Sequence, residues 1–142
     1  MKVHKETPII QVTLRKFERP YGDFEELLRK FLMSIGLLQP GDSRDDVVKV
    51  MRELLRARRE KRILQVKDLV KLTDVSPPNA RRHLRRLREL GLVERHERGY
   101  RLREWMDLPS LVDGVREFVL PPILKRVREY AEAVESTFPE GL

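Results

Sequence analysis

The 142-residue sequence contains no cysteine, which excludes disulfide bonds, thiolate metal sites and cysteine nucleophiles. It also lacks any run of 18 or more apolar residues, and its amino terminus has neither a long apolar segment nor a small-residue cleavage site. We therefore expect a cytoplasmic protein with no membrane partner.

Signatures of catalysis and of cofactor binding are missing too. The three histidines, His4, His83 and His96, have no spacing that would bring two of them to one metal ion. There is no glycine-rich phosphate loop, and paired carboxylates occur only where they favour the first turn of a helix. We expect no enzymatic activity, no catalytic or metal-binding residues and no cofactor.

Positive charge is concentrated in about one third of the chain. The net charge is +7, but residues 56–104 contain 16 basic and seven acidic residues, a net charge of +9, whereas the remainder carries −2. A charge run of this kind is often only a solvated surface. Its segregation favours a polyanionic partner, with nucleic acid as the first candidate.

The N-terminal part has the pattern of a strand followed by a helix. Residues 9–17 alternate apolar and polar side chains, which predicts a half-buried strand. This strand has no local partner, and pairing with a second copy of the chain is one solution. Asp23 can cap a helix whose apolar positions fall on one face and which ends near Gly36.

Three further elements are predicted before the most basic segment. A linker at Pro40–Gly41 precedes a helix that begins at Ser43 and ends near Lys61. Residues 63–65 are predicted to be extended. Residues 66–73 have the apolar spacing of a short amphipathic helix.

The next helix has clear signals at both ends. Ser76 is suited to the N-cap, and Pro77 to the first helical position, where its missing N–H is not needed. Gly91 can supply the left-handed conformation that ends the helix. The inward stripe consists of Ala80, Leu84 and Leu87, with Leu90 at its edge.

Two short strands, 92–96 and 100–104, are predicted after this helix, with Gly99 providing the positive φ of a tight turn. This order of elements is that of a winged helix-turn-helix. The string S-x-x-x-A-x-x-x-L-x-x-L-x-x-x-G-L-V-E from Ser76, followed by G-Y-x-L, resembles the reading head of MarR-type and ArsR-type transcriptional regulators. The resemblance covers residues 45–104 and implies a DNA-reading role.

The resemblance does not extend to effector chemistry. The metal-binding cysteines of many ArsR-type sensors are missing, and the wing lacks the Asp-x-Arg signature common in MarR-type proteins. Only the fold and the DNA-reading role are implied, and a small-molecule effector is left unknown.

The predicted fold class is mainly α with a small β wing. A winged helix-turn-helix core carries an N-terminal strand–helix extension and C-terminal helices. The predicted parts are an extension at residues 1–41, a DNA-binding domain at residues 42–105 and C-terminal helices for dimerisation at residues 106–142.

The predicted recognition helix carries five arginines within residues 81–88. If its N-terminal half enters a major groove, Asn79 and Arg82 lie near base edges, where Arg suits guanine and Asn suits adenine. The neighbouring arginines suit phosphates, and Arg98 at the wing tip suits the adjacent minor groove or backbone. The predicted DNA-binding residues are Ser76, Pro78, Asn79, Arg81, Arg82, Arg85, Arg86, Arg88, Arg95, Arg98 and Arg101.

The C-terminal third is predicted to form two helices, the first starting around Pro109 and ending at the break Pro121–Pro122. Apolar residues in the second helix recur at the heptad spacing. A helix packed in the monomer's core would have the same pattern, but one reading head buries little surface, which favours a homodimer. The predicted dimerisation residues are Leu120, Leu124, Val127, Ala131, Val134 and Phe138.

Together these features predict a sequence-specific transcriptional regulator that binds double-stranded DNA as a homodimer, with helix 77–90 in the major groove and wing 92–104 on the adjacent backbone or minor groove. The alternative is a winged-helix protein-interaction module within a transcription or chromosome-maintenance complex. RNA binding is disfavoured, because only Tyr100 and Trp105 could stack on bases near the basic segment.

Overall fold

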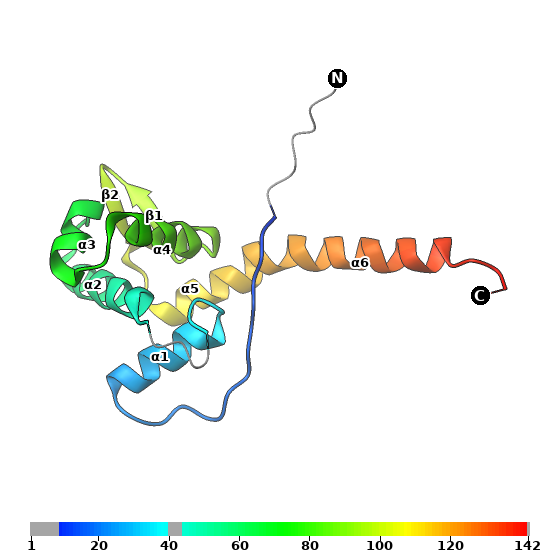
Figure 1. The fold of residues 1–142 in the computed structure, drawn as a ribbon, viewed down its shortest axis with the longest axis horizontal. Coiled ribbons are helices and arrows are strands. Elements are labelled where there is room, and N and C mark those ends of the chain that lie inside the picture. Colours follow the sequence, from blue (N-terminus) through cyan, green and yellow to red (C-terminus); the bar gives the residue numbers. More distant parts are fainter. Residues whose placement is uncertain (1–8, 40–43, 142) are drawn as a thin grey trace, which may run out of the picture.

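The computed structural model describes residues 9–39 and 44–141. They form a helical body from which a long C-terminal helix projects (Figure 1). The elements are α1 (Phe24–Ser34), α2 (Asp46–Glu60), α3 (Val66–Thr73), α4 (Pro77–Glu89), β1 (Val93–His96), β2 (Gly99–Leu102), α5 (Leu108–Gly114) and α6 (Leu120–Thr137). This mainly α architecture with its two-stranded wing confirms the predicted winged helix-turn-helix.

A single apolar core joins the body. Helices α2, α3 and α4 pack against one another and contribute fully buried side chains such as Leu54, Leu69 and Leu84. Leu32 of α1 and Leu111 of α5 belong to the same buried cluster. The winged helix-turn-helix therefore shares its core with the segments on both sides of it, and the boundaries at residues 41 and 105 stay predictions.

Local capping explains where the helices of the reading head begin. The side chains of Gln65 and Asp68 form a capping box at the start of α3. Ser76 accepts a hydrogen bond from the N–H of Asn79 at 3.4 Å, as predicted for the N-cap of α4. Gly91, with a φ of 79°, ends that helix in the predicted left-handed conformation.

Helix α2 begins later than predicted. Asp45 is its N-cap and the helix starts at Asp46, so the helix does not extend back to Ser43 as expected. The predicted linker Pro40–Gly41 and Ser43 itself lie outside the described residues.

The wing is a tight antiparallel hairpin in which His96 pairs with Gly99. Leu64 adds a bridge to Tyr100, with N···O distances of 3.0 and 2.7 Å, and this places the predicted extended piece beside β2. The positive φ predicted for Gly99 is wrong. The positive φ of the turn, 56°, belongs to Glu97. A Cβ at Gly99 would lie 2.6 Å from the side chain of Ile63, so this position needs glycine for close approach.

The strand predicted at residues 9–17 is also wrong, because this segment is extended but belongs to no sheet among the described residues. The N–H of Arg15 donates to the carbonyl of Ser34 at 2.8 Å, and its guanidinium donates to the carbonyl of Met33 at 2.9 Å. The polar groups of the segment therefore bind the end of α1. Its alternating pattern leaves Ile10 and Leu14 exposed.

The predicted break at Pro121–Pro122 is absent. A π turn at Val115–Val119 connects α5 to α6, and the prolines fall in the first turn of α6. The wider π turn accommodates the proline rings and their missing N–H groups. The two helices consequently run on as one rod (Figure 1). No helix in the described residues is long and apolar enough to cross a membrane.

Candidate nucleic-acid interface

Helix α4 presents its arginine-rich side to solvent. Ala80, Leu84 and Leu87 are buried against the body, as the stripe predicted. The residues that are exposed on the outer side are Ser76, Pro78, Arg81, Arg82, Arg85, Arg88 and Glu89. Four cations therefore lie together on one helical surface.

These four arginines, with Arg98 of the wing, form what we call the free arginine set: Arg81, Arg82, Arg85, Arg88 and Arg98. Within residues 9–39 and 44–141 no hydrogen bond or ion pair holds any of them. Uncompensated cations that repel one another do not stabilise the free protein. Their guanidinium groups remain available to a polyanion.

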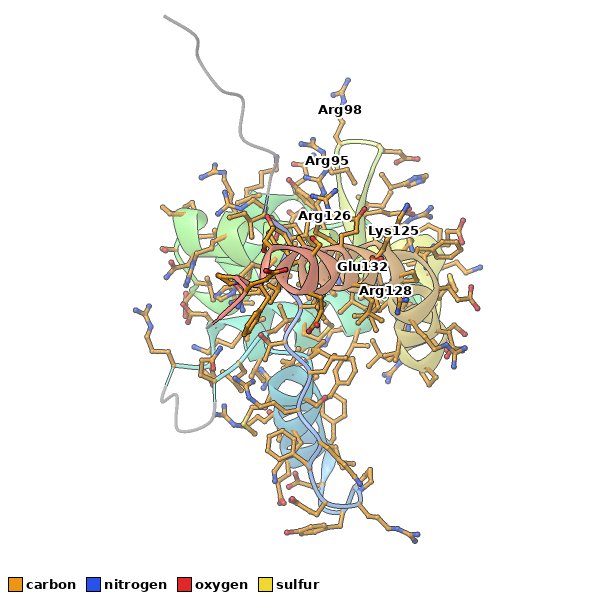
Figure 2. All side chains as sticks on the ribbon, turned by 90° about the vertical axis from the view of Figure 1, so that its right-hand side faces the viewer. Arg95, Arg98, Lys125, Arg126, Arg128 and Glu132 are labelled. Carbon is orange, nitrogen blue, oxygen red and sulfur yellow. The ribbon has the colours of Figure 1, made fainter. Side chains whose placement is uncertain are left out.

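The wing continues the positive surface. Figure 2 shows Arg98 at the tip of the hairpin with Arg95 below it, on the same side of the molecule. Arg95 is exposed and lies over the ring of Tyr100 at 5.3 Å. Tyr100, which pairs with Arg95 one position from the turn of the hairpin, thus supports this side chain and leaves its charge exposed.

Three of the predicted DNA-binding residues are engaged inside the protein. The amide of Asn79 donates to the carboxylate of Asp46 at 3.2 Å, which ties α4 to the start of α2. Arg101 donates to Glu94 at 2.7 Å and stacks on the ring of Trp105 at 4.3 Å. The side chain of Arg101 is only 12% exposed, and Asn79 is partly buried.

Arg86 is the third, and its side chain does not face solvent as expected for a DNA-binding residue. Its guanidinium donates to the carbonyls of Gly36 and Leu37, at 2.8 and 3.4 Å, just after the end of α1. Burial, together with the neighbouring Arg82, lowers the pKa of Arg86. A cation near the C-terminus of a helix interacts favourably with the helix dipole. No pattern in the sequence indicates that the turn after α1 lies against α4.

His83 is a feature of α4 that sequence reasoning missed. Its side chain is only 5% exposed, and both ring nitrogens lack a hydrogen-bond partner among the described residues. Burial, with added repulsion from Arg82 and Arg86, lowers the pKa of His83 to about 4 from its ordinary 6.5. The imidazole is therefore neutral near pH 7.

We expect His83 to make folding pH-dependent. Between its unfolded pKa of 6.5 and its folded pKa of about 4, the unfolded chain binds a proton that the folded chain excludes. The free energy of unfolding should therefore fall as the pH falls, by about 2 kcal/mol between pH 7.5 and 5. Urea denaturation of the natural protein and of His83→Leu at both pH values measures the difference. Equal losses in the two proteins would contradict the assignment.

Helix α6 carries the predicted dimerisation stripe, and the structure leaves most of it uncovered. Leu124, Val127, Val134 and Phe138 are each about 60% exposed, with values of 63, 59, 61 and 61%. Leu120 alone packs partly against the core. The alternative of a helix packed in the monomer's core does not hold for the described residues.

Comparison with known proteins identifies the reading head. Residues 46–95, from the start of α2 into β1, match the family model described as bacterial regulatory protein, arsR family. No curated protein and no solved structure matched the chain. The match leaves the subfamily unassigned and suggests a regulator without enzymatic activity. It supports what the fold and the arginine-rich surface already indicate, a winged helix-turn-helix transcriptional regulator that binds DNA.

Proposed function

We propose that the protein is a sequence-specific regulator that binds double-stranded DNA as a homodimer. Helix α4 enters the major groove, and the wing contacts the adjacent backbone or minor groove. The observation that carries this proposal is the free arginine set, which lies on two separate elements and has no partner within the described residues. An ordinary solvated helix face would explain the exposed arginines of α4, but it would not explain the exposed arginine at the wing tip as well.

The contacts in the free protein divide the predicted residues by role. Arg82 lies exposed near the start of α4, and we assign it to a base edge. Asn79 reaches a base only after it releases Asp46. We assign the other exposed arginines, whose contacts give affinity without sequence information, to phosphates: Arg81, Arg85, Arg88, Arg95 and Arg98.

Arg86 and Arg101 support this surface from beneath. The first fixes α4 to the turn after α1, and the second fixes the wing through Glu94 and Trp105. We propose that they position the DNA-contacting residues and do not themselves leave these contacts for the duplex. If Arg86 or Arg101 left these contacts, the carbonyl or carboxylate oxygens that it binds would lose their hydrogen-bond donor.

The proposed homodimer follows from α6. This helix projects from the body (Figure 1), and its apolar stripe beyond Leu120 has no cover among the described residues. The heptad spacing matches the seam of a coiled coil, and a second copy of the same helix fits such a seam. Two reading heads also supply the contact area that one head lacks.

Separate alanine variants test the assigned roles. Arg82→Ala should weaken binding of the preferred duplex by about 1 to 3 kcal/mol per subunit and relax the preference at one base position in each half-site. Arg88→Ala, as the matched control, should weaken preferred and mismatched duplexes equally. Titrations of both duplexes with each variant measure the difference. If Arg82→Ala loses affinity but keeps its discrimination, the docking of α4 is wrong.

The alternative, a winged helix that binds an acidic protein, predicts a different outcome in the same titrations. Such a module would not distinguish one duplex from another, and it would bind plain duplex weakly at moderate salt. Tight and sequence-dependent binding by the natural protein excludes it.

A further inference from the structure

The charged residues of α6 are divided along its length. Lys125 and Arg128 lie in its N-terminal half, and Glu132 and Glu135 lie in its C-terminal half. None of these four has an ion-pair partner in the part of the chain that the structure describes. The helix therefore carries uncompensated charge of opposite sign in its two halves.

These four residues also share one flank of the apolar stripe. At 3.6 residues per turn they fall within an arc of about 80° that borders the stripe beside Leu124. Figure 2, which looks along α6 from its C-terminal end, shows Lys125, Arg128 and Glu132 to one side of Arg126. The residues that border the stripe on its other side, Ile123, Tyr130 and Thr137, carry no charge.

We propose that α6 pairs with α6 of a second copy in the antiparallel orientation, so that the basic half of each charged flank lies against the acidic half of the other. The proposal rests on the homodimer proposed above and adds its polarity. In an antiparallel pair the same flank of both helices meets across the seam. In a parallel pair the charged flank would meet the partner's uncharged flank, and no ion pairs would form.

One register uses the whole stripe. It pairs Leu120 with the partner's Phe138, Leu124 with the partner's Val134, and Val127 with the partner's Ala131. In this register Lys125 lies beside the partner's Glu132 and Glu135. All six stripe residues are then covered and the flanking charges are paired.

The base of α6 has a place for the end of the partner helix. Leu120 lines an apolar hollow of about 80 Å³ between the N-terminal segment, α4 and α5, together with Leu14, Leu90 and Leu92. In the antiparallel register the exposed ring of the partner's Phe138 arrives at Leu120, at the mouth of this hollow. A parallel pair would place both Phe138 rings at the far end of the helices.

The position of the wings favours the same polarity. Figures 1 and 2 both show the wing projecting sideways from the line of α6, and in Figure 2 Arg126 lies on the same side as Arg98. The apolar stripe is centred about 120° around the helix from Arg126. A partner on the stripe therefore lies beside α6 and not between α6 and the DNA.

Symmetry then decides which pair can bind one duplex. An antiparallel pair has its two-fold axis perpendicular to the helices, which keeps both wings on one side of the dimer. A parallel pair has its two-fold axis along the helices, which turns the second wing to the opposite side. Only the antiparallel pair presents both reading heads to the same DNA.

Oxidative cross-linking of full-length cysteine variants tests the polarity, since the natural chain contains no cysteine. Leu124→Cys and Val134→Cys lie opposite each other only in the antiparallel register, where the two copies of either residue are about 15 Å apart. We expect the mixed variants to form a disulfide-linked dimer and each variant alone to stay unlinked. Linkage of each variant alone would overturn the antiparallel orientation and leave the homodimer standing.

Sedimentation of the same samples separates the two proposals. Monomers would refute the homodimer itself, whereas unlinked dimers would show that the seam lies elsewhere and would refute this pairing.

Charge reversal gives an independent readout on the flank. Lys125→Glu/Arg128→Glu and Glu132→Lys/Glu135→Lys should each raise the dimer dissociation constant about tenfold, because like charges then face each other along the whole flank. Mixing the two variants should restore association. Arg126→Glu/Glu129→Lys reverses an ion pair, 2.8 Å long, on the far side of α6 and should leave association unchanged. If the mixture associates no better than the separate variants, the proposed flank contacts are refuted.

Discussion

Replacing Arg85 and Arg88 together with alanine should weaken duplex binding about a thousandfold at 0.15 M salt. With about five phosphate contacts per subunit, the natural dimer should lose affinity with a log–log salt slope of about −9. The double variant removes four contacts per dimer, which reduces the slope to about −5.5. If the natural dimer and the double variant bind equally well near 1 M salt, this difference in slope makes their affinities differ about a thousandfold at 0.15 M salt.

A matched variant separates this effect from a general loss of charge. Arg19→Ala/Arg59→Ala removes the same charge from exposed positions outside α4 and the wing. It should change the slope little. Circular dichroism should show that both variants keep their helices, since neither pair of side chains contributes to the core. Equal slopes for the two double variants would contradict the assignment of α4 to the DNA.

Leu124→Asp should convert the dimer into folded monomers. Leu124 is 63% exposed in the single chain, so the change costs the monomer little. In the seam it would bury an unpaired carboxylate on each copy, which should raise the dimer dissociation constant about a thousandfold. Analytical ultracentrifugation with circular dichroism measures both effects.

Ala133→Asp is the control, because Ala133 lies on the same helix but away from the stripe. It should remain dimeric. A Leu124→Asp protein that stays dimeric would place the seam outside α6, and one that unfolds would show that the stripe supports the monomer.

The helices of the reading head were predictable because their signals are local. Ser76, Pro77 and Gly91 act through backbone groups within one turn of themselves, and the structure keeps them in those roles. The inward stripe of α4 follows from helical geometry alone. The exposure of most of the arginines on α4 follows from the same projection.

The errors arose where a distant segment decided the outcome. The alternation in residues 9–17 is typical of a strand, but Arg15 binds the end of α1 and no neighbouring strand is present in the described residues. Arg86 lies on a polar side of α4 but binds the turn that follows α1, a contact that only the tertiary fold sets. Gly99 faces Ile63 across the wing, a contact that no local pattern encodes.

The prolines of α6 show a second kind of error, in which the rule for proline holds but the chain accommodates it in an unexpected way. A proline inside a helix removes a hydrogen bond and collides with the preceding turn. Here the turn before Pro121 widens into a π turn, and the rod continues. This continuation carries the apolar stripe away from the body and gives α6 its proposed part in assembly.

Selection of bound duplexes from a random pool, at stated salt, tests the central claim most directly. Sequence-specific binding by a two-fold dimer predicts enrichment of a palindrome whose half-sites are centred about 10 base pairs, or a small multiple of that, apart. Arg82→Ala should enrich the same spacing with one position relaxed in each half-site. A retained pool with no enriched sequence, or no retention of duplex at low salt, would contradict the account.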